Sequence, residues 1–314
     1  MVDYLDNENL IFDRRALRQH HERVSGSDDN PLFDEIALRL ADRLLDVQRD
    51  FPLALDIGFR GGECARAVRA TNRIKRLIVC DPSIRILGHT DCTTGTNAVV
   101  ADEEFLPFAL KKFDLITSSL ALHWTNDLPG ALAQVQRALK PDGLFLAAMF
   151  AGETLHELRE VLIEAELAER GGASPRVSPM IDIAEASSLL QRAAFALPVV
   201  DTDTLTLPYP TALALMADLR AMGETNVMRA RGRGFTPRTV IFKAAELYHA
   251  RYGQPDGRIR ATFQIAYLTG WSPDQSQQQP IRPGSAVTRL ADALNTKEQS
   301  AGEKAGPDDT AGHS

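Results

Sequence analysis

The sequence predicts a doubly wound α/β fold, and three observations support this. From residue 51 onward, short apolar runs typical of strands alternate with segments of helical periodicity. The first run ends in a glycine-containing turn that opens a helix, Asp56-Ile-Gly-Phe-Arg-Gly-Gly-Glu63. Lys140-Pro-Asp-Gly143 is a turn that ends one helix and starts the next strand. Strands that alternate with helices imply a parallel sheet covered on both faces.

Residues 1–50 are predicted to form an N-terminal helical cap. Apolar residues recur at spacings of three and four from Phe33 to Leu44, which gives one apolar face opposite charged side chains. A loop with helix-start chemistry, Ser25 to Pro31, precedes this face.

The main domain is predicted to span residues 51–272, with a helical insertion at about 210–252. Residues 273–314 are rich in Gln, Ser, Pro, Gly and Asp, and we expect a disordered tail there. The predicted strands are 53–57, 76–80, 98–101, 113–118, 143–150, 199–209 and 260–271, and the predicted helices are 63–70, 127–139, 153–170, a shorter one ending near 194, 211–222 and 237–251.

Composition and charge exclude several classes of protein. The 314 residues carry a formal net charge of −7, which argues against a protein that mainly binds nucleic acid. Cys64, Cys80 and Cys92 lack metal-ligand spacing and indicate a reducing compartment. No apolar run reaches the roughly 18 residues of a membrane span, and the N-terminus lacks the features of a signal peptide or presequence. We expect a soluble protein of the bacterial cytoplasm, whose oligomeric state the sequence does not indicate.

Residues that follow the first two strands form a candidate nucleotide- or nucleoside-binding site. Gly58 and Gly62 follow the first strand, where glycine permits a positive φ and close approach of a ligand. Asp81 ends the second strand, 23 residues beyond Gly58, near the spacing of an acid that binds ribose hydroxyls. The alternatives are an ordinary glycine turn and a turn-forming Asp-Pro.

Two further segments extend this site. Asp102 and Glu103 follow the third strand, where a carboxylate can accept a hydrogen bond from an exocyclic amine; an acidic helix start is the alternative. The fourth strand leads into His123 and Trp124, which are candidates for a substrate pocket, with core packing as the alternative for His123.

Together these stretches resemble the class I S-adenosylmethionine-dependent methyltransferases, in the subgroup that includes those of biotin synthesis. A closer resemblance is to the mitochondrial complex I assembly factor 5 family and its bacterial relatives, over roughly residues 8–285. It rests on LALHWTNDLPGALAQVQRALKPDGLFLAAMFAGETLHELR, SPRVSPM, DTDTLTLPYP, DLRAMGETN and ATFQIAYLTGWSP.

The resemblance implies a Rossmann-like, seven-stranded methyltransferase sheet that binds S-adenosyl-L-methionine. It also implies hydroxylation of an arginine on an iron–sulfur subunit of complex I, which would be the partner. By position, the resemblance assigns Asp56, Gly58 and Gly62 to the methionine-side loop, Asp81 to the ribose, and Asp102 with Glu103 to the adenine.

Arg60 departs from the family pattern, in which a small residue and a glycine usually stand at the positions of Phe59 and Arg60. A non-glycine residue at positive φ costs about 1–2 kcal/mol, and its side chain could occupy cofactor space. Gly61 could take over the tight position if the loop shifts. Alternatively, Arg60 could bind the methionine carboxylate of the cofactor. The retained acids Asp81 and Asp102 favour a loop that still binds the cofactor.

Three functions remain open at this point: a methyltransferase of a small or carrier-bound acid, a complex I maturation factor that modifies a protein arginine, and a non-catalytic binding module. The sequence identifies no catalytic general base. His20-His21-Glu22 and His156-Glu157 offer no third ligand at metal-binding spacing, so we predict no metal site.

Overall fold

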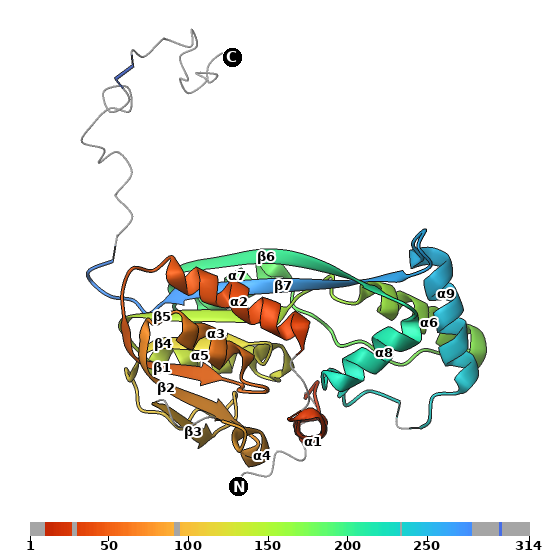
Figure 1. Ribbon diagram of the computed structural model, residues 1–314, viewed down its shortest axis with the longest axis horizontal. Helices are drawn as coiled ribbons and strands as arrows, with labels where there is room; N and C mark the ends of the chain where they lie inside the picture. The colour runs from red at the N-terminus through yellow and green to blue at the C-terminus, as the bar shows by residue number, and fades with distance from the viewer. Residues whose placement is uncertain (1–9, 27–29, 91–94, 233, 278–294, 297–314) are drawn as a thin grey trace, which may run out of the picture. The chain divides into compact units, whose positions relative to one another are not determined.

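The computed structural model describes residues 10–26, 30–90, 95–232, 234–277 and 295–296. The chain divides into two compact units, Met1–Gln275 and Ser276–Ser314, and every helix and strand described below lies in the first (Figure 1). The predicted tail, residues 273–314, lies almost entirely outside the described residues.

The first unit is built on a seven-stranded sheet in the order β3-β2-β1-β4-β5-β7-β6. The five strands from β1 to β5 pair in parallel, whereas β7 is antiparallel to β5 and β6 is antiparallel to β7. The predicted fold is confirmed, and the sheet is mixed. The strands are β1 Phe51–Ile57, β2 Ile74–Asp81, β3 Thr96–Val100, β4 Phe113–Ser119, β5 Leu139–Phe150, β6 Ala196–Tyr209 and β7 Ile259–Trp271.

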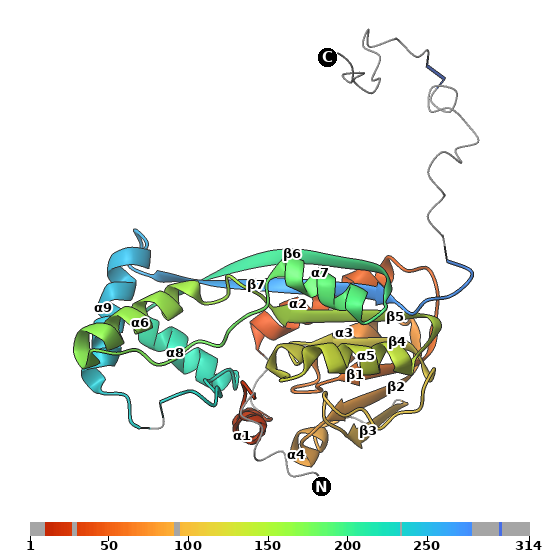
Figure 2. The same cartoon turned by 180° about the vertical axis from the view of Figure 1, so that it is seen from behind.

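Helices cover both faces of this sheet, as their apolar stripes require. One apolar cluster joins α2 and α3 to the first face, and a second cluster joins α5 and α7 to the other (Figures 1 and 2). Alternate residues of β1 serve the two clusters, with Ala54 in one and Leu55 in the other. The helices are α1 Arg14–Val24, α2 Pro31–Leu45, α3 Glu63–Ala70, α4 Ile84–Leu87, α5 Leu128–Ala138, α6 His156–Arg170, α7 Ile183–Arg192, α8 Ala212–Ala221 and α9 Arg238–Tyr252, with a 3₁₀ turn η2 at Leu122–Trp124.

Local chemistry explains most helix boundaries. Asn30 caps α2 by accepting hydrogen bonds from the backbone N–H groups of Leu32 and Phe33, and Pro31 occupies the first helical position. The helix predicted from residue 153 begins later, at His156, because Leu155 takes a left-handed conformation with φ 54°. The helix α4 was not predicted, since four residues are too few to show a period.

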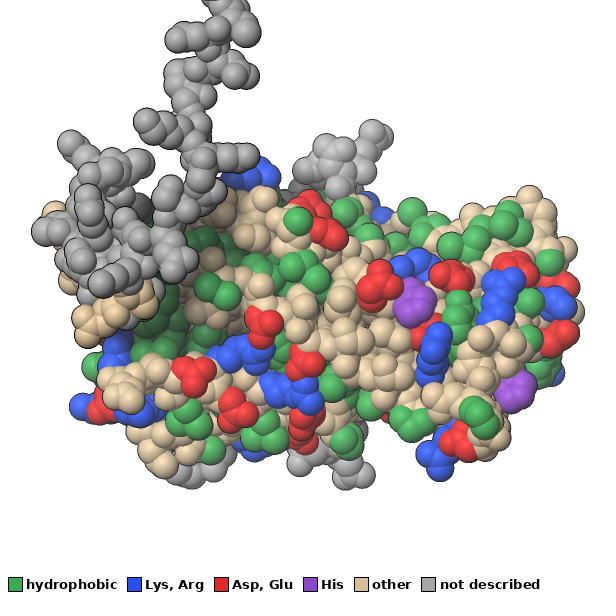
Figure 3. Space-filling view, turned by 90° about the horizontal axis from the view of Figure 1, so that it is seen from above, with side chains coloured by type: hydrophobic (Ala, Val, Ile, Leu, Met, Phe, Trp, Pro, Cys, Tyr) green, Lys and Arg blue, Asp and Glu red, His purple; other side chains and the backbone are tan. Residues whose placement is uncertain are grey.

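The last two strands extend past the rest of the sheet and carry a helical layer. β5 pairs with β7 only from Ile265 to Trp271, whereas β6 pairs with β7 as far as Ile259. Helices α6, α8 and α9 gather against this extension (Figure 1), and the fully buried Tyr248 and Phe263 belong to their core. At the β6 edge of the sheet, Arg39 and Arg43 of α2 pair with Asp203 and Asp201 of β6. Figure 3 views the molecule from the side on which β6 lies in Figure 1, and it shows acidic and basic side chains interspersed there.

Candidate cofactor and substrate site

The loop between β1 and α3 needs glycine at two positions. Gly58 has φ +77°, and a Cβ there would lie 2.2 Å from the Cβ of Ala121. Gly62 has φ +81°, and a Cβ there would lie 2.8 Å from Cζ of Phe59. Because any side chain would collide with neighbouring atoms, both glycines are required for this loop to lie against the end of β4.

Asp56 lies beneath this loop and is fully buried. Its Oδ1 accepts a hydrogen bond of 2.8 Å from Oγ1 of Thr117, and its Oδ2 has no hydrogen-bond partner among the described residues. Burial raises the pKa of Asp56 to about 7. Asp56 therefore supports the loop from below and does not line any of the three cavities described below.

Asp81 stands at the carboxyl end of β2, as predicted. Its Oδ1 accepts a hydrogen bond of 2.9 Å from the backbone N–H of Ser83, and its Oδ2 accepts one of 3.3 Å from the backbone N–H of Arg60. Burial raises the pKa of Asp81, and these two N–H groups oppose the shift. Asp81 lines a cavity of about 240 Å³, here called the strand-end cavity, whose wall also includes Pro82, Ile86, Asp102, Glu103 and residues of α1.

Arg14 of α1 binds both predicted adenine-side acids. Its guanidinium lies 3.0 Å from Oδ1 of Asp102 and also pairs with the carboxylate of Glu103. Burial raises the pKa of Glu103 to about 7, and the charge of Arg14 opposes this shift. The first helix therefore lies across the ends of β2 and β3, a contact that the sequence analysis did not identify.

Arg60 keeps the left-handed conformation expected of a glycine, with φ 50°, and the positive φ does not move to Gly61. Its side chain is only 8% exposed and donates 2.8 Å and 3.0 Å hydrogen bonds to the carbonyl oxygens of Leu120 and Met222. Its guanidinium also lies 2.5 Å from Oε1 of Glu224. Binding of Arg60 to a cofactor carboxylate stays a prediction, because Glu224 holds the guanidinium in this structure.

A second cavity lies beside the loop, with a volume of about 360 Å³. This loop cavity is lined by Arg60, Gly61, Glu63 and residues of α1 and α8, and it shares His21 and Ile86 with the strand-end cavity. Nε2 of His21 is buried and has no hydrogen-bond partner among the described residues. Burial, together with the charge of Arg60, lowers the pKa of His21 well below its usual value, so its imidazole is neutral.

His123 and Trp124, the predicted substrate-pocket residues, form the turn η2. Nε2 of His123 lies 3.5 Å from Oε2 of Glu224, and burial lowers its pKa. The imidazole packs against the ring of Phe150 at 5.1 Å between centroids. Of the two, Trp124 lines a third cavity, and His123 lines none of the three described here.

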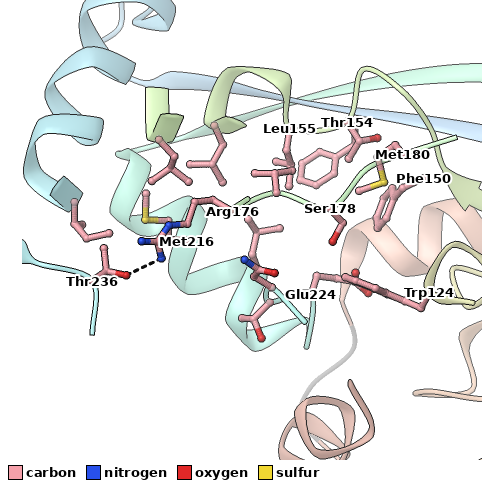
Figure 4. Close-up of a pocket in the computed structure, with 18 residues that line it drawn as sticks. Trp124, Phe150, Thr154, Leu155, Arg176, Ser178, Met180, Met216, Glu224 and Thr236 are labelled. Atoms are coloured by element: carbon pink, nitrogen blue, oxygen red, sulfur yellow. Dashed lines mark hydrogen bonds between the residues drawn. The ribbon is translucent and has the colours of Figure 1, made fainter. Parts of the chain in front are cut away.

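That third cavity, here called the helical cavity, has a volume of about 210 Å³. Figure 4 shows Trp124 and Glu224 at one end of it and Arg176 with Thr236 at the other. Arg176 donates a 2.8 Å hydrogen bond to Thr236 and forms an ion pair with the buried Glu166. Most of the wall between the two ends is apolar, and it includes Phe150, Leu155, Leu158, Leu162, Val177, Met180, Met216, Leu219, Ile241 and Phe263.

Sequence reasoning missed four residues of this region. Arg14 and His21 lie in the N-terminal segment that was predicted only as a helical cap, and Glu224 and Arg176 lie in connections without periodicity. The available indications were Arg60, since an arginine buried in a glycine turn needs an acidic partner, and the family-like stretches SPRVSPM and DLRAMGETN, which contain Arg176 and Glu224. No group of three or more His, Cys, Asp or Glu side chains suited to a metal occurs in the described parts of the chain.

The same fold occurs in proteins of known name. Residues 55–147 match the family model of the methyltransferase domain. Among solved structures, the YcgJ protein from Bacillus subtilis shares the fold with a TM-score of 0.52 at 17% identity, covering 76% of this chain and 98% of that chain. The residues at the strand ends also fit the cofactor of this class, because Asp81 lies in a cavity that adjoins the loop cavity through His21 and Ile86. The fold and the site define a class I, S-adenosyl-L-methionine-dependent methyltransferase-like protein.

Longer matches specify the family. The chain is 42% identical over 287 residues to the arginine-hydroxylase NDUFAF5, mitochondrial, of Danio rerio, covering 90% of this chain and 89% of that protein. It is 41% identical to the protein of that name from Homo sapiens, covering 90% and 83%. The malonyl-[acyl-carrier protein] O-methyltransferase of Halorhodospira halophila is 32% identical, covering 83% and 88%. The chain belongs to the family of the arginine-hydroxylase NDUFAF5, which confirms the resemblance found in its motifs.

Proposed function

We propose that this protein hydroxylates a protein arginine during the maturation of respiratory complex I. The observation that carries the proposal is the extent of the match to NDUFAF5, which covers 90% of this chain at 42% identity. The methyltransferase domain model covers only residues 55–147, so the match also includes the helical layer and its cavity. The proposed partner is an iron–sulfur subunit of complex I, and the proposed location is the bacterial cytoplasm.

The strand-end and loop cavities would hold the cofactor. Asp81 would bind the ribose hydroxyls, and Asp102 with Glu103 would face the adenine once Arg14 yields part of its contacts. The turn that contains Gly58 and Gly62 would lie against the methionine portion. Bound S-adenosyl-L-methionine carries a methyl group activated by the positive sulfonium.

The helical cavity would take the substrate side chain. Its apolar wall, with Phe150 and Trp124 near the cofactor side, excludes water and restricts the orientation of a bound aliphatic chain. Both buried charges at its ends are already compensated, Glu224 by Arg60 and Arg176 by Glu166. The residues of this chain therefore contribute orientation and a dry site.

A second function is favoured by a separate observation. The malonyl-[acyl-carrier protein] O-methyltransferase of Halorhodospira halophila is 32% identical over 266 residues, and the match covers 88% of that protein. Methyl transfer to a carrier-bound acid would use the same cofactor site and would place the acyl chain in the apolar helical cavity.

Mass spectrometry of the complex I iron–sulfur subunit distinguishes these functions. Subunit from cells that lack this protein would be compared with subunit from cells complemented by the native chain or by Asp81→Ala. An added oxygen on one arginine that needs the native chain supports hydroxylation, and a methyl group that needs it supports methyl transfer. A subunit unchanged by deletion would contradict a complex I substrate.

A further inference from the structure

A buried ion pair joins the cofactor loop to the helical layer. The guanidinium of Arg60 lies 2.5 Å from Oε1 of Glu224, which is 164 residues away in the sequence. The two side chains are 8% and 5% exposed. Burial works to raise the pKa of Glu224, but the charge of Arg60 together with His123 and His21 lowers it to about 2, so the carboxylate is ionised at neutral pH.

The other contacts of Arg60 show what this ion pair controls. Its side chain is held by the carbonyl oxygens of Leu120 and Met222 and lies over the ring of Phe33, with 4.7 Å from Cζ to the ring centroid. Its backbone N–H donates to Oδ2 of Asp81, the acid at the end of β2. The position of one side chain therefore affects the loop backbone and the orientation of Asp81 together.

The loop conformation depends on this anchoring because Arg60 has φ 50°. L-residues other than glycine rarely adopt that region unless the surroundings hold them there. Without the charge of Glu224, the guanidinium would be a buried cation with only carbonyl acceptors, and such a group moves toward water. The loop cavity, lined by Arg60, Gly61 and Glu63, is the space open to it.

We infer that Glu224 is a positioning residue for the cofactor: through Arg60 it holds the loop between β1 and α3 in the shape that leaves room for S-adenosyl-L-methionine. Glu224 lines the helical cavity and neither of the two cavities beside the loop, so it acts without touching the cofactor. The inference rests on cofactor binding at this loop and is independent of whether the reaction is hydroxylation or methyl transfer.

A double-mutant cycle tests this coupling. The affinity for S-adenosyl-L-methionine would be measured by calorimetry for the full chain, Glu224→Gln, Arg60→Gly and the double variant. We expect Glu224→Gln to weaken binding about tenfold in the native background. In the Arg60→Gly background we expect a change below about twofold, because glycine adopts a positive φ without an anchor. Equal losses in the two backgrounds, or native-like binding by Glu224→Gln, would overturn the inference.

A matched variant separates positioning from general destabilisation. Glu166 is also buried and also paired with an arginine. Its pKa is also lowered to about 2, since the hydrogen bonds from Arg176 and Ser174 together outweigh burial. Glu166→Gln is expected to lower the melting temperature as Glu224→Gln does, with cofactor affinity within about twofold of native. A similar loss of affinity in Glu166→Gln would overturn the inference, as would the absence of binding by the native chain.

Discussion

The acids beneath and beside the cofactor loop differ from those at the helical cavity, although both sets are buried. Burial raises the pKa of Asp56 and Glu103 to about 7. The pKa values of Glu224 and Glu166 are instead about 2, because an arginine and further hydrogen-bonding or charged neighbours together outweigh burial at each. Oδ1 of Asp56 accepts a hydrogen bond from the hydroxyl of Thr117, and Arg14 divides its charge between Asp102 and Glu103.

This difference separates two ways of building a site. At the helical cavity, Glu224 and Arg176 each have a dedicated ionic partner, while Nε1 of Trp124 and Nε of Arg176 have no hydrogen-bond partner among the described residues. At the strand ends, Arg14 shares its charge between two acids, and Nε2 of His21, a residue that lines both the strand-end and the loop cavity, has no hydrogen-bond partner within the described part of the chain. Polar groups left in this state favour a polar ligand, so the cavities proposed for cofactor and for substrate each offer a group for a ligand to bind.

The largest expected effect is on stability, and it comes from removing the arginine that pairs with a buried glutamate. Arg60→Ala removes the arginine partner of the buried Glu224 carboxylate and leaves it, among the described residues, only the imidazole of His123 at 3.5 Å, and we expect the free energy of unfolding to fall by about 3–5 kcal/mol. Urea denaturation followed by circular dichroism measures this. Arg39→Ala, which removes the more exposed pair with Asp203, is the control and should cost about 1 kcal/mol or less. Similar losses of unfolding free energy in both variants would show that the buried Arg60–Glu224 pair stabilises the fold no more than the more exposed Arg39–Asp203 pair does.

The second prediction concerns the pH dependence of stability. The folded pKa of Asp56 is about 7 and its ordinary value is 3.8, so the folded state binds more protons than the unfolded state between these values. Stability therefore falls as the pH rises from about 4 to 7, by an amount on the order of 3 kcal/mol.

Asp56→Asn tests this directly. The amide cannot ionise, so the decline should become shallower, and the remaining slope comes from other acids whose pKa burial raises, among them Glu103 and Asp81. Thermal unfolding at a series of pH values measures it, with the exposed Asp201→Asn as the control. An unchanged slope in Asp56→Asn would contradict the raised pKa.

The third prediction addresses the strand-end cavity. Asp81→Ala removes the acid expected to bind the ribose hydroxyls and also the acceptor for the N–H of Arg60. Hydrogen bonds to a charged group contribute about 1.5–3 kcal/mol, so cofactor affinity should fall by roughly 10- to 100-fold. Calorimetry with S-adenosyl-L-methionine checks this, and Asp201→Ala should bind as the native chain does. Native affinity in Asp81→Ala would remove Asp81 from the cofactor site.

The smallest effect is expected at the far end of the helical cavity. Thr236→Val removes the hydroxyl that accepts a hydrogen bond from Arg176, which still keeps its ion pair with Glu166. We expect a loss of about 1 kcal/mol in stability and no change in cofactor affinity. A weaker affinity for S-adenosyl-L-methionine in Thr236→Val would show that the far end of the helical cavity is energetically coupled to the cofactor site.

Much of the fold could be predicted because its causes are local. The helix predicted at 63–70 has those bounds, since a glycine turn starts it and the apolar spacing continues to Ala70. The strand predicted at 76–80 lies within β2, which ends at Asp81 as expected, because a short apolar run bounded by Asp-Pro identifies it; β2 begins two residues earlier, at Ile74. The orientation of the last two strands was not predicted. Alternation of apolar and polar residues in β6 indicates a half-exposed strand, but it does not indicate which strand pairs with β6 or in which direction.

The sequence by itself determined the elements, the glycines of the loop and the acid at the end of β2, because neighbouring residues specify them. The tertiary structure decided which acid pairs with Arg60, that Arg14 covers Asp102 and Glu103, and that α6, α8 and α9 enclose a cavity. The chain has 42 acidic residues, and nothing local selects Glu224 as the partner of Arg60. An ion pair depends on distance and burial in the folded chain, and only the packing of distant segments sets these quantities.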